Sequence, residues 1–288
     1  MTLPAFDYRE PETLAEVLAL LREHGDEARL MGGGTALTLM LRARLVRPSV
    51  IVSLARLGAL VGIRANGHLE IGAMTTHRAV ERSPLVRALA PLLAEACERV
   101  GSPPIRNMGT LGGNLATGEA ASDPAPALLA LDARVRLRGP EGERVLALDG
   151  FFRDFYETAL GPEEVIVAIE VPPVPAGARA AFVKYTCLSE EERAVVSVAA
   201  LLAMGRDGTV VEARIGLGAV GPTPFRARAA ETLLVGHRPT VARAAAAADA
   251  AAAGTAPLDD RQGSAEYRRE MTRVWVLRLV EQLAAGTA

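Results

Sequence analysis

The sequence has few of the residues on which several common kinds of chemistry depend. Its 288 residues include two cysteines, Cys97 and Cys187, which lie far apart and in no C-x-x-C pattern. A disulfide framework, a zinc site and an iron–sulfur cluster within this chain are therefore not expected. The four histidines stand at no ligand spacing, and no Ser-His-Asp or Cys-His arrangement suggests a nucleophile. We therefore expect no catalytic residue and no metal site in this chain, and expect a bound cofactor to supply the chemistry.

An excess of charge and long apolar runs are also missing. Lys and Arg number 32 against 34 Asp and Glu, so the net charge is −2, which argues against a nucleic-acid surface. No apolar run reaches the roughly 18 residues that span a bilayer. The N-terminus carries Asp7, Arg9 and Glu10 instead of a basic region followed by an apolar one. We expect a soluble, cytoplasmic protein without a membrane span or a nucleic-acid partner.

Lysine is almost absent, because Lys184 is the only lysine among the 32 basic residues. Such a preference for arginine points to a coding bias across the genome. A lysine kept against that background indicates a position that needs a compact ammonium group, which arginine cannot imitate. The alternative is that one lysine survives by chance.

The length and the distribution of glycine and proline predict two units. A chain of 288 residues exceeds the usual single domain, and half of its residues are hydrophobic, enough for two cores. The segment 172–178, rich in Pro, Gly and Ala, is the predicted boundary. Strands are expected beyond it at 182–186, 195–204 and 210–218, followed by helices at 226–234, 240–253 and 267–283. The second unit is therefore predicted to be an antiparallel sheet followed by helices.

The first unit mixes helices and short strands. Thr13 and Glu16 form a capping-box pattern that opens a helix, and residues 28–31 predict a strand that leads into three glycines. The Asn66-Gly67 pair predicts a hairpin, and helices are expected at 76–82 and 84–100. A second hairpin over 135–148 and a strand at 164–171 complete the unit. No repeated βα alternation occurs, so the fold class is predicted to be α+β.

Two glycine-rich segments, 32–37 (GGGTAL) and 109–114 (GTLGGN), are the clearest candidates for a binding site. Glycines leave backbone N–H groups accessible to a ligand, so that successive N–H groups can hold a diphosphate, with Thr35 and Thr110 as further donors. Neither segment is a Walker A motif, and neither completes G-x-G-x-x-G, because Leu37 stands where the last glycine belongs. One such segment alone is typical of a tight turn. Two in one unit indicate a split nucleotide site.

An acidic residue follows the second segment. Asp123 stands nine residues after Asn114, directly before a proline. Aspartate in this position typically starts a turn or caps a helix. In a nucleotide site its carboxylate would instead accept hydrogen bonds from a ribose or another diol, and both interpretations stay open at this point.

Together these motifs resemble the FAD-binding medium subunits of molybdenum hydroxylases, the family of CO dehydrogenase and xanthine dehydrogenase. Residues 30–37 (LMGGGTAL) resemble the first flavin-binding signature of that family. Residues 106–115 (RNMGTLGGNL) followed by 122–124 (SDP) resemble the second. The segments 161–166 (GPEEVI), 182–184 (FVK), 216–227 (GLGAVGPTPFRA) and 263–269 (GSAEYRR) match in the same order, so the resemblance covers essentially the whole chain.

The resemblance implies a fold and a binding site. The fold would be a PCMH-type FAD-binding domain over residues 1–175, with two lobes of about 1–60 and 61–175, followed by a C-terminal domain over 179–288. Within the site, Asp123 would contact the ribityl chain or a ribose, the backbone of Ile166 would contact the isoalloxazine or the adenine, and Lys184 would approach the flavin ring. The cofactor-binding residues implied are Met31, Gly32, Gly33, Gly34, Thr35, Ala36, Leu37, Thr110, Leu111, Gly112, Gly113, Asn114, Asp123, Ile166 and Lys184.

The resemblance also implies a function. This chain would bind FAD and transfer electrons within a molybdenum-dependent dehydrogenase. A large partner subunit would carry the molybdenum cofactor, and a small partner would carry two [2Fe-2S] clusters, in a heterotrimer or its dimer. Electrons would leave the FAD to an external acceptor such as NAD⁺ or a quinone.

One segment departs from the family pattern, and two other functions remain as alternatives. Many members carry an Arg pair and an acidic residue after the lysine, whereas this chain has Tyr185 to Arg193 (YTCLSEEER). The first alternative is a standalone FAD-dependent reductase or oxidase of the same superfamily. It would need a residue that protonates the substrate, and no clear candidate is present. The second alternative is a flavin-free structural subunit, against which the intact glycine segments and Lys184 argue.

Overall fold

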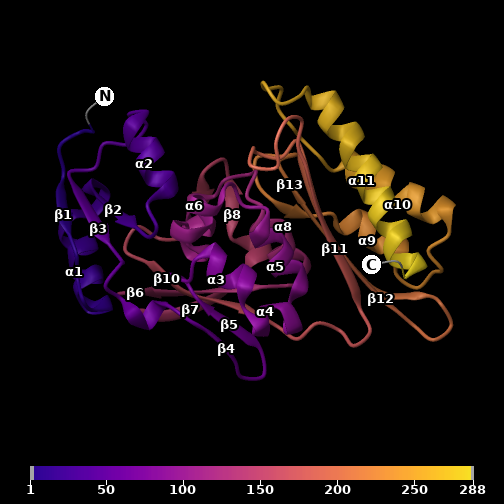
Figure 1. Ribbon diagram of the computed structural model, residues 1–288, viewed down its shortest axis with the longest axis horizontal. Helices are drawn as coiled ribbons and strands as arrows, with labels where there is room; N and C mark the ends of the chain where they lie inside the picture. The colour runs from indigo at the N-terminus through magenta and orange to yellow at the C-terminus, as the bar shows by residue number, and fades with distance from the viewer. Residues whose placement is uncertain (1–2, 287–288) are drawn as a thin grey trace.

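The N-terminal part of the chain forms a small parallel sheet. The computed structural model describes residues 3–286 (Figure 1), so the outermost residues of the two predicted domains, 1–2 and 287–288, lie outside the described residues. The sheet has the order β1-β3-β2, from Asp7–Arg9, Val50–Ser53 and Ala28–Met31. Helix α1 (Leu14–His24) begins as predicted, since Thr13 Oγ1 accepts a hydrogen bond from the Glu16 N–H at 3.2 Å. Helix α2 (Thr35–Arg42) follows β2 directly, so the first glycine segment is the turn between them.

The next part of the chain is a five-stranded antiparallel sheet with helices on one face. Both predicted hairpins are present, as β4-β5 and β6-β7. The sheet has the order β4-β5-β10-β6-β7, from Ile63–Ala65, Leu69–Gly72, Val165–Val171, Arg134–Gly139 and Gly142–Ala147. A two-stranded ribbon, β8 (Phe152–Asp154) and β9 (Glu157–Thr158), stands apart from it. The helices are α3 (His77–Arg82), α4 (Pro84–Leu89), α5 (Pro91–Glu98), α6 (Pro103–Met108), α7 (Leu111–Thr117) and α8 (Pro124–Ala130).

The single helix predicted over 84–100 is wrong. The chain leaves helical geometry at Ala90, with φ −145° and ψ 59°, and helix α5 begins at Pro91. Proline disfavours the helical conformation in the residue before it and has no N–H to continue the ladder. The apolar spacing on both sides of Pro91 had suggested one continuous helix, although Pro91 itself marks the break.

The C-terminal part is an antiparallel sheet followed by three helices, as predicted, but the sheet has a fourth short strand, and Arg226 lies in that strand and not in the helix predicted from it. The order is β11-β12-β13-β14, from Arg179–Tyr185, Val196–Met204, Val210–Gly218 and Phe225–Arg226. Helices α9 (Arg228–Leu234), α10 (Val241–Ala253) and α11 (Ala265–Ala285) follow. The mixture of antiparallel sheets and helices confirms the α+β class. No helix among residues 3–286 combines the length and apolar character needed to cross a membrane.

Each face of the C-terminal sheet contributes side chains to a different hydrophobic core. Side chains alternate between the faces of a strand. In β12, Ala199 and Leu201 pack into the core beneath α5 and α8, whereas Val198, Ala200 and Leu202 pack against α9–α11. Figure 1 shows the sheet standing between these two groups of helices. Residues 172–178 connect β10 to β11, and the buried core continues from one sheet to the other, so residues of both can meet in one site.

Candidate functional site

The two glycine segments lie in direct contact with each other. A β-carbon placed on Gly33 would lie 1.7 Å from the carbonyl oxygen of Met108, which no side chain can do. A β-carbon on Gly32 would lie 2.8 Å from the Thr110 Oγ1 atom. Glycine is therefore required at 33 because the turn after β2 is packed against the backbone that leads into α7. The structure brings together the two segments that the sequence suggested as halves of one site.

The N-terminus of α2 is open for a ligand. Gly34, with φ +71°, occupies the cap position and offers no side chain to the first turn. No backbone carbonyl among residues 3–286 accepts a hydrogen bond from the N–H groups of Thr35, Ala36 or Leu37. Residues 31–38 are half-buried, so these donors are neither exposed on a convex surface nor sealed in the core. Free N–H groups and the positive end of the helix dipole favour an anion such as a phosphate at this point.

The second glycine segment differs from what its sequence suggested, because its N–H groups are already bonded. The N–H of Leu111 donates to Thr75 O and that of Gly112 to Ala73 O, both at 2.9 Å. The N–H of Gly113 donates to the Thr110 side chain at 3.2 Å, so Thr110 caps α7. Leu111 and Gly112 are buried, and Leu111 belongs to the core. The expectation that this segment presents successive N–H donors is therefore wrong, and only its half-buried residues Gly113 and Asn114 can face a ligand.

A buried ion network holds the second segment against α3. Glu81 accepts hydrogen bonds from Arg78 at 2.6 Å and from Arg106 at 3.2 Å. The His77 N–H donates to Gly109 O at 3.0 Å, and burial, with a smaller contribution from Arg106, lowers the pKa of His77 to about 4. The imidazole is therefore neutral at physiological pH. No local sequence pattern indicates this network, because its members come from two helices, α3 and α6, that are separate in the sequence.

Lys184 is held in a buried ion pair with Asp123. The Lys184 Nζ group donates to Asp123 Oδ2 at 2.9 Å and to the carbonyl oxygen of Arg99 at 2.8 Å. The exposed fractions of the two side chains are only 3% and 7%. An arginine in this narrow position would have to place a planar guanidinium where an ammonium fits, which explains why lysine stays here. Two residues that the sequence singled out separately thus touch across the shared sheet.

Asp123 does not act as a helix cap. It precedes α8, but its side chain makes no capping bond, and its Oδ1 atom is buried without a hydrogen-bond donor from residues 3–286. Burial raises the pKa of Asp123 to about 7, against the opposing effect of Lys184 and Arg99. A buried carboxylate oxygen without a donor is costly. A ligand hydroxyl would remove that cost, so this atom favours the ligand-binding interpretation of Asp123.

The pKa of Asp123 predicts that the stability of the apoprotein falls as pH rises. In the unfolded chain the carboxyl group titrates near 4, whereas in the folded chain it titrates near 7. The folded state therefore binds more protons between these values, and stability is lost as pH rises through this range. We expect the free energy of unfolding of the wild type, relative to Asp123→Asn, to fall by about 2–3 kcal/mol between pH 5 and pH 8. Urea unfolding of both apoproteins at the two pH values measures it, and parallel pH profiles would contradict the prediction.

The remaining predicted residues are placed as follows. Met31 is the last residue of β2, at the entrance to the glycine turn. The Asn114 Oδ1 atom accepts a hydrogen bond from the Ser122 hydroxyl at 2.5 Å, which joins the second segment to Asp123. Ile166 pairs with Leu137 in the five-stranded sheet and points its side chain into the core. Any contact of Ile166 with a ligand would therefore involve its backbone, as the resemblance implied.

The segment that departs from the family pattern is tied to the same region. In residues 186–194, Glu190 forms an ion pair with Arg99 at 2.9 Å, and Arg193 forms one with Glu119 at 2.8 Å. Arg99 also accepts the hydrogen bond from Lys184 through its carbonyl oxygen. Glu190 thus links the middle of this segment to Arg99, which bonds Lys184, although the sequence of the segment differs from the usual pattern.

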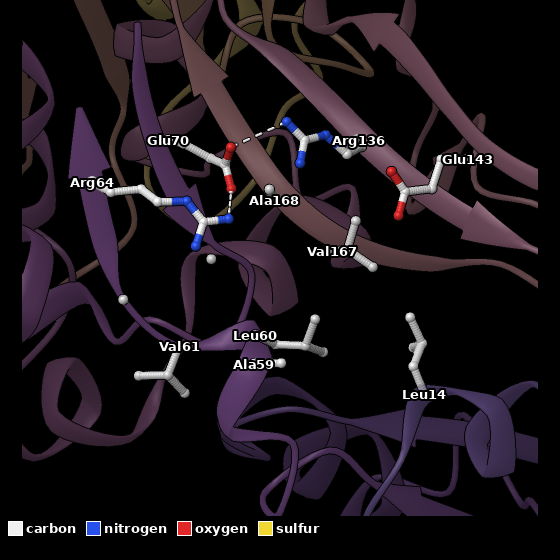
Figure 2. Close-up of a pocket in the computed structure, with 12 residues that line it drawn as sticks. Leu14, Ala59, Leu60, Val61, Arg64, Glu70, Arg136, Glu143, Val167 and Ala168 are labelled. Carbon is white, nitrogen blue, oxygen red and sulfur yellow. Dashed lines mark hydrogen bonds and ion pairs between the residues drawn. The ribbon is translucent and has the colours of Figure 1, made fainter. Parts of the chain in front are cut away.

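A separate hollow of about 220 Å³ lies at the junction of the five-stranded sheet with α1 and the segment before β4 (Figure 2). Leu14, Leu60 and Val167 are among its apolar residues, and Figure 2 shows Glu70 between Arg64 and Arg136 on its other side. Glu70, His68 and Glu170 lie close enough to share a metal ion. Both carboxylates, however, accept hydrogen bonds from Arg136. Their charges are therefore already compensated within an ion-pair network.

The chain matches two known protein families that together cover most of its length. The family described as "FAD binding domain in molybdopterin dehydrogenase" matches residues 4–174, and the "CO dehydrogenase flavoprotein C-terminal domain" matches residues 181–283. The chain is 38% identical over 285 residues to the carbon monoxide dehydrogenase medium chain of Afipia carboxidovorans, covering 98% of this chain and 97% of the relative.

Solved structures share the whole fold. A structure of carbon monoxide dehydrogenase from Hydrogenophaga pseudoflava, which lacks the Mo-pyranopterin moiety of its cofactor, matches with a TM-score of 0.96 and 37% identity over 99% of both chains. Quinoline 2-oxidoreductase from Pseudomonas putida 86 matches with a TM-score of 0.92 and 34% identity, again over 99% of both chains. The chain therefore belongs to the family of FAD-binding subunits of molybdopterin dehydrogenases, and it is a flavoprotein component of an oxidoreductase.

Proposed function

We propose that this chain binds one FAD at the junction described above and passes electrons from a partner subunit to an external acceptor. The diphosphate would lie at the N-terminus of α2, where the N–H groups of Thr35, Ala36 and Leu37 are free. Gly32 and Gly33 pack against the segment that leads into α7, and Gly113 and Asn114 would line the opposite side. The flavin end would lie toward Asp123 and Lys184, beside the shared sheet.

The residues of the chain fit such a cofactor in three independent respects. The helix end supplies donors for the phosphates. The close contact of Gly33 with Met108 holds the two glycine segments side by side. The buried Oδ1 atom of Asp123 lacks the donor that a cofactor hydroxyl would supply. This last observation carries the proposal, because no donor among residues 3–286 satisfies this buried carboxylate oxygen.

When bound, FAD supplies the ability to take up and release electrons, which the side chains of this chain lack. The chain binds and orients the cofactor, keeps one edge of its site free of water and places a positive charge at Lys184 beside it. We propose that the electrons come from two [2Fe-2S] clusters on a small partner subunit, which receive them from a molybdenum cofactor on a large partner. The assembly would be a heterotrimer or its dimer. The relatives named for carbon monoxide and for quinoline support this class of complex and leave the substrate of this one to be determined.

Isolation of the complex through a tag on this chain tests the proposal. We expect one FAD, one molybdenum and roughly four iron atoms per tagged chain, because two [2Fe-2S] clusters hold four. Carbon monoxide, quinoline and simple aldehydes are then added in turn, and cluster reduction is followed by visible absorption. With a substrate found in this way, a complex stripped of FAD should still show cluster reduction but lose acceptor reduction at least tenfold. Unchanged acceptor reduction without FAD would contradict the proposed route.

A further inference from the structure

The buried pair of Lys184 and Asp123 has a feature that cofactor binding alone does not require. Lys184 uses two of its three protons on Asp123 Oδ2 and Arg99 O. Its charge is therefore opposed by a carboxylate at hydrogen-bond distance, in surroundings almost free of water. A lysine that served only to present a positive charge to a ligand would be weakened by such a partner.

The Lys184–Asp123 pair has few other charged or polar neighbours. Lys184 lies on β11 and faces Ser197 across the strands, and the Ser197 hydroxyl is buried and forms no hydrogen bond with residues 3–286. Cys97, at the end of α5, is buried nearby, and Arg99 is the other charged residue close to Asp123. Apart from Asp123, no carboxylate in the described part of the chain bonds Lys184.

We propose that Asp123 is a positioning residue for Lys184, which holds the ammonium in place and balances its charge, and that the pair together sets how strongly this chain stabilises reduced FAD. The inference rests on the proposed function, because it requires that FAD binds beside the pair. A reduced flavin bears more negative charge than the oxidised form. An unbalanced Lys184 would therefore favour reduction, and the ionised Asp123 keeps that preference moderate.

Four proteins test the proposal: the wild type, Asp123→Asn, Lys184→Gln and the double variant. Asp123→Asn keeps the shape of the side chain, Lys184→Gln keeps a hydrogen-bond donor at its end, and each removes the charge. The readout is the midpoint potential of FAD in the loaded chain, measured at pH 8 by titration with dithionite in the presence of a redox dye. In this reaction the dithionite is oxidised and the flavin takes up two electrons.

We expect Asp123→Asn to favour reduced FAD about tenfold, a rise of about 30 mV for a two-electron couple. Lys184→Gln should shift the potential by a similar amount in the opposite direction. The double variant should stay within about threefold of Lys184→Gln, because without Lys184 there is no ammonium group for Asp123 to hold or balance. Equal shifts for Asp123→Asn with and without Lys184 would overturn the proposal, as would no shift at all.

Glu119→Gln is the matched control. It removes one negative charge four residues before Asp123, but Glu119 pairs with Arg193, whose side chain is 63% exposed. Water screens such a pair, so we expect Glu119→Gln to change the equilibrium between oxidised and reduced FAD less than threefold. A shift as large as that of Asp123→Asn would show a general charge effect and overturn the role of the pair.

Thermal unfolding of the four apoproteins keeps the test decisive if a variant does not retain FAD. The effect of Asp123→Asn on Tm should differ by about 5 °C between the wild-type and Lys184→Gln backgrounds, because coupled residues are not additive. Additive effects would overturn the pairing. If the wild type itself takes up no FAD, the proposed function fails, and this additivity test still decides separately whether Asp123 and Lys184 act as a pair.

Discussion

Replacement of Gly33 by alanine is expected to abolish stoichiometric FAD binding. The new methyl group would lie 1.7 Å from the Met108 carbonyl oxygen, where it meets backbone and not the end of a flexible side chain. The chain can accommodate it only by moving the turn after β2 away from the segment that leads into α7. This movement opens the two sides of the proposed cradle and misplaces the N–H groups of α2. Because overpacking costs about 1–3 kcal/mol, the Tm of the apoprotein should also fall by several degrees.

Fluorescence quenching in a titration measures the affinity for FAD. We expect at least a 100-fold rise in the Kd of Gly33→Ala relative to the wild type. Gly150→Ala is the control, because a β-carbon there meets no atom within 4 Å and Gly150 is exposed. That protein should bind FAD like the wild type. If Gly33→Ala also bound FAD normally, the contact between the two glycine segments would have no role in the site.

Replacement of Arg226 by methionine is expected to cause the largest loss of stability among the substitutions proposed for this chain. The Arg226 guanidinium forms a two-pronged ion pair with Glu231 at 2.6 and 2.8 Å, and both residues are buried. It also bonds Asp132, just after α8, while Glu231 accepts the Ile215 N–H of β13. The network therefore fastens α8 to the C-terminal sheet. Loss of one partner leaves a buried charge unpaired, which costs about 3–5 kcal/mol.

At roughly 3 °C per kcal/mol, the Tm should fall by about 10 °C, as measured by calorimetry. The neighbouring Arg228 provides the comparison. Its ion pair with Asp149 is exposed, with 59% and 43% of the two side chains accessible. Arg228→Met should therefore cost no more than about 1 kcal/mol. Equal losses of stability in Arg226→Met and Arg228→Met would show that burial of the Arg226 network contributes nothing to the stability of the fold.

Both substitutions show what could be predicted from the sequence and what could not. The glycines at 32–34 could be identified, because runs of glycine are rare and chemically specific. The reason why glycine is needed at 33 could not be predicted, since the close approach of Gly33 to Met108 joins residues 75 positions apart in the chain. Arg226 lies in a segment that resembles the family, but its partners Glu231 and Asp132 come together only when α8 packs on the sheet.

Composition singled out Lys184 and local pattern singled out Asp123, each without the other. That they form a pair depends on the packing of the C-terminal sheet against α5 and α8, which no local pattern contains. The second glycine segment illustrates the opposite error. Its composition suggested free N–H donors, but the backbone of Leu111 and Gly112 is bonded to Thr75 and Ala73. Tertiary hydrogen bonds thus decide which N–H groups remain for a ligand.

The most direct measurement for the central claim is the visible absorption spectrum of the purified chain, with the released cofactor identified by mass. We predict one FAD per chain, either as purified or after addition of FAD, with absorption maxima typical of a bound flavin. A colourless chain that takes up no added FAD would contradict the account. The free N–H groups of α2 and the unpartnered oxygen of Asp123 would then need another explanation, and a structural subunit without flavin would be the better description.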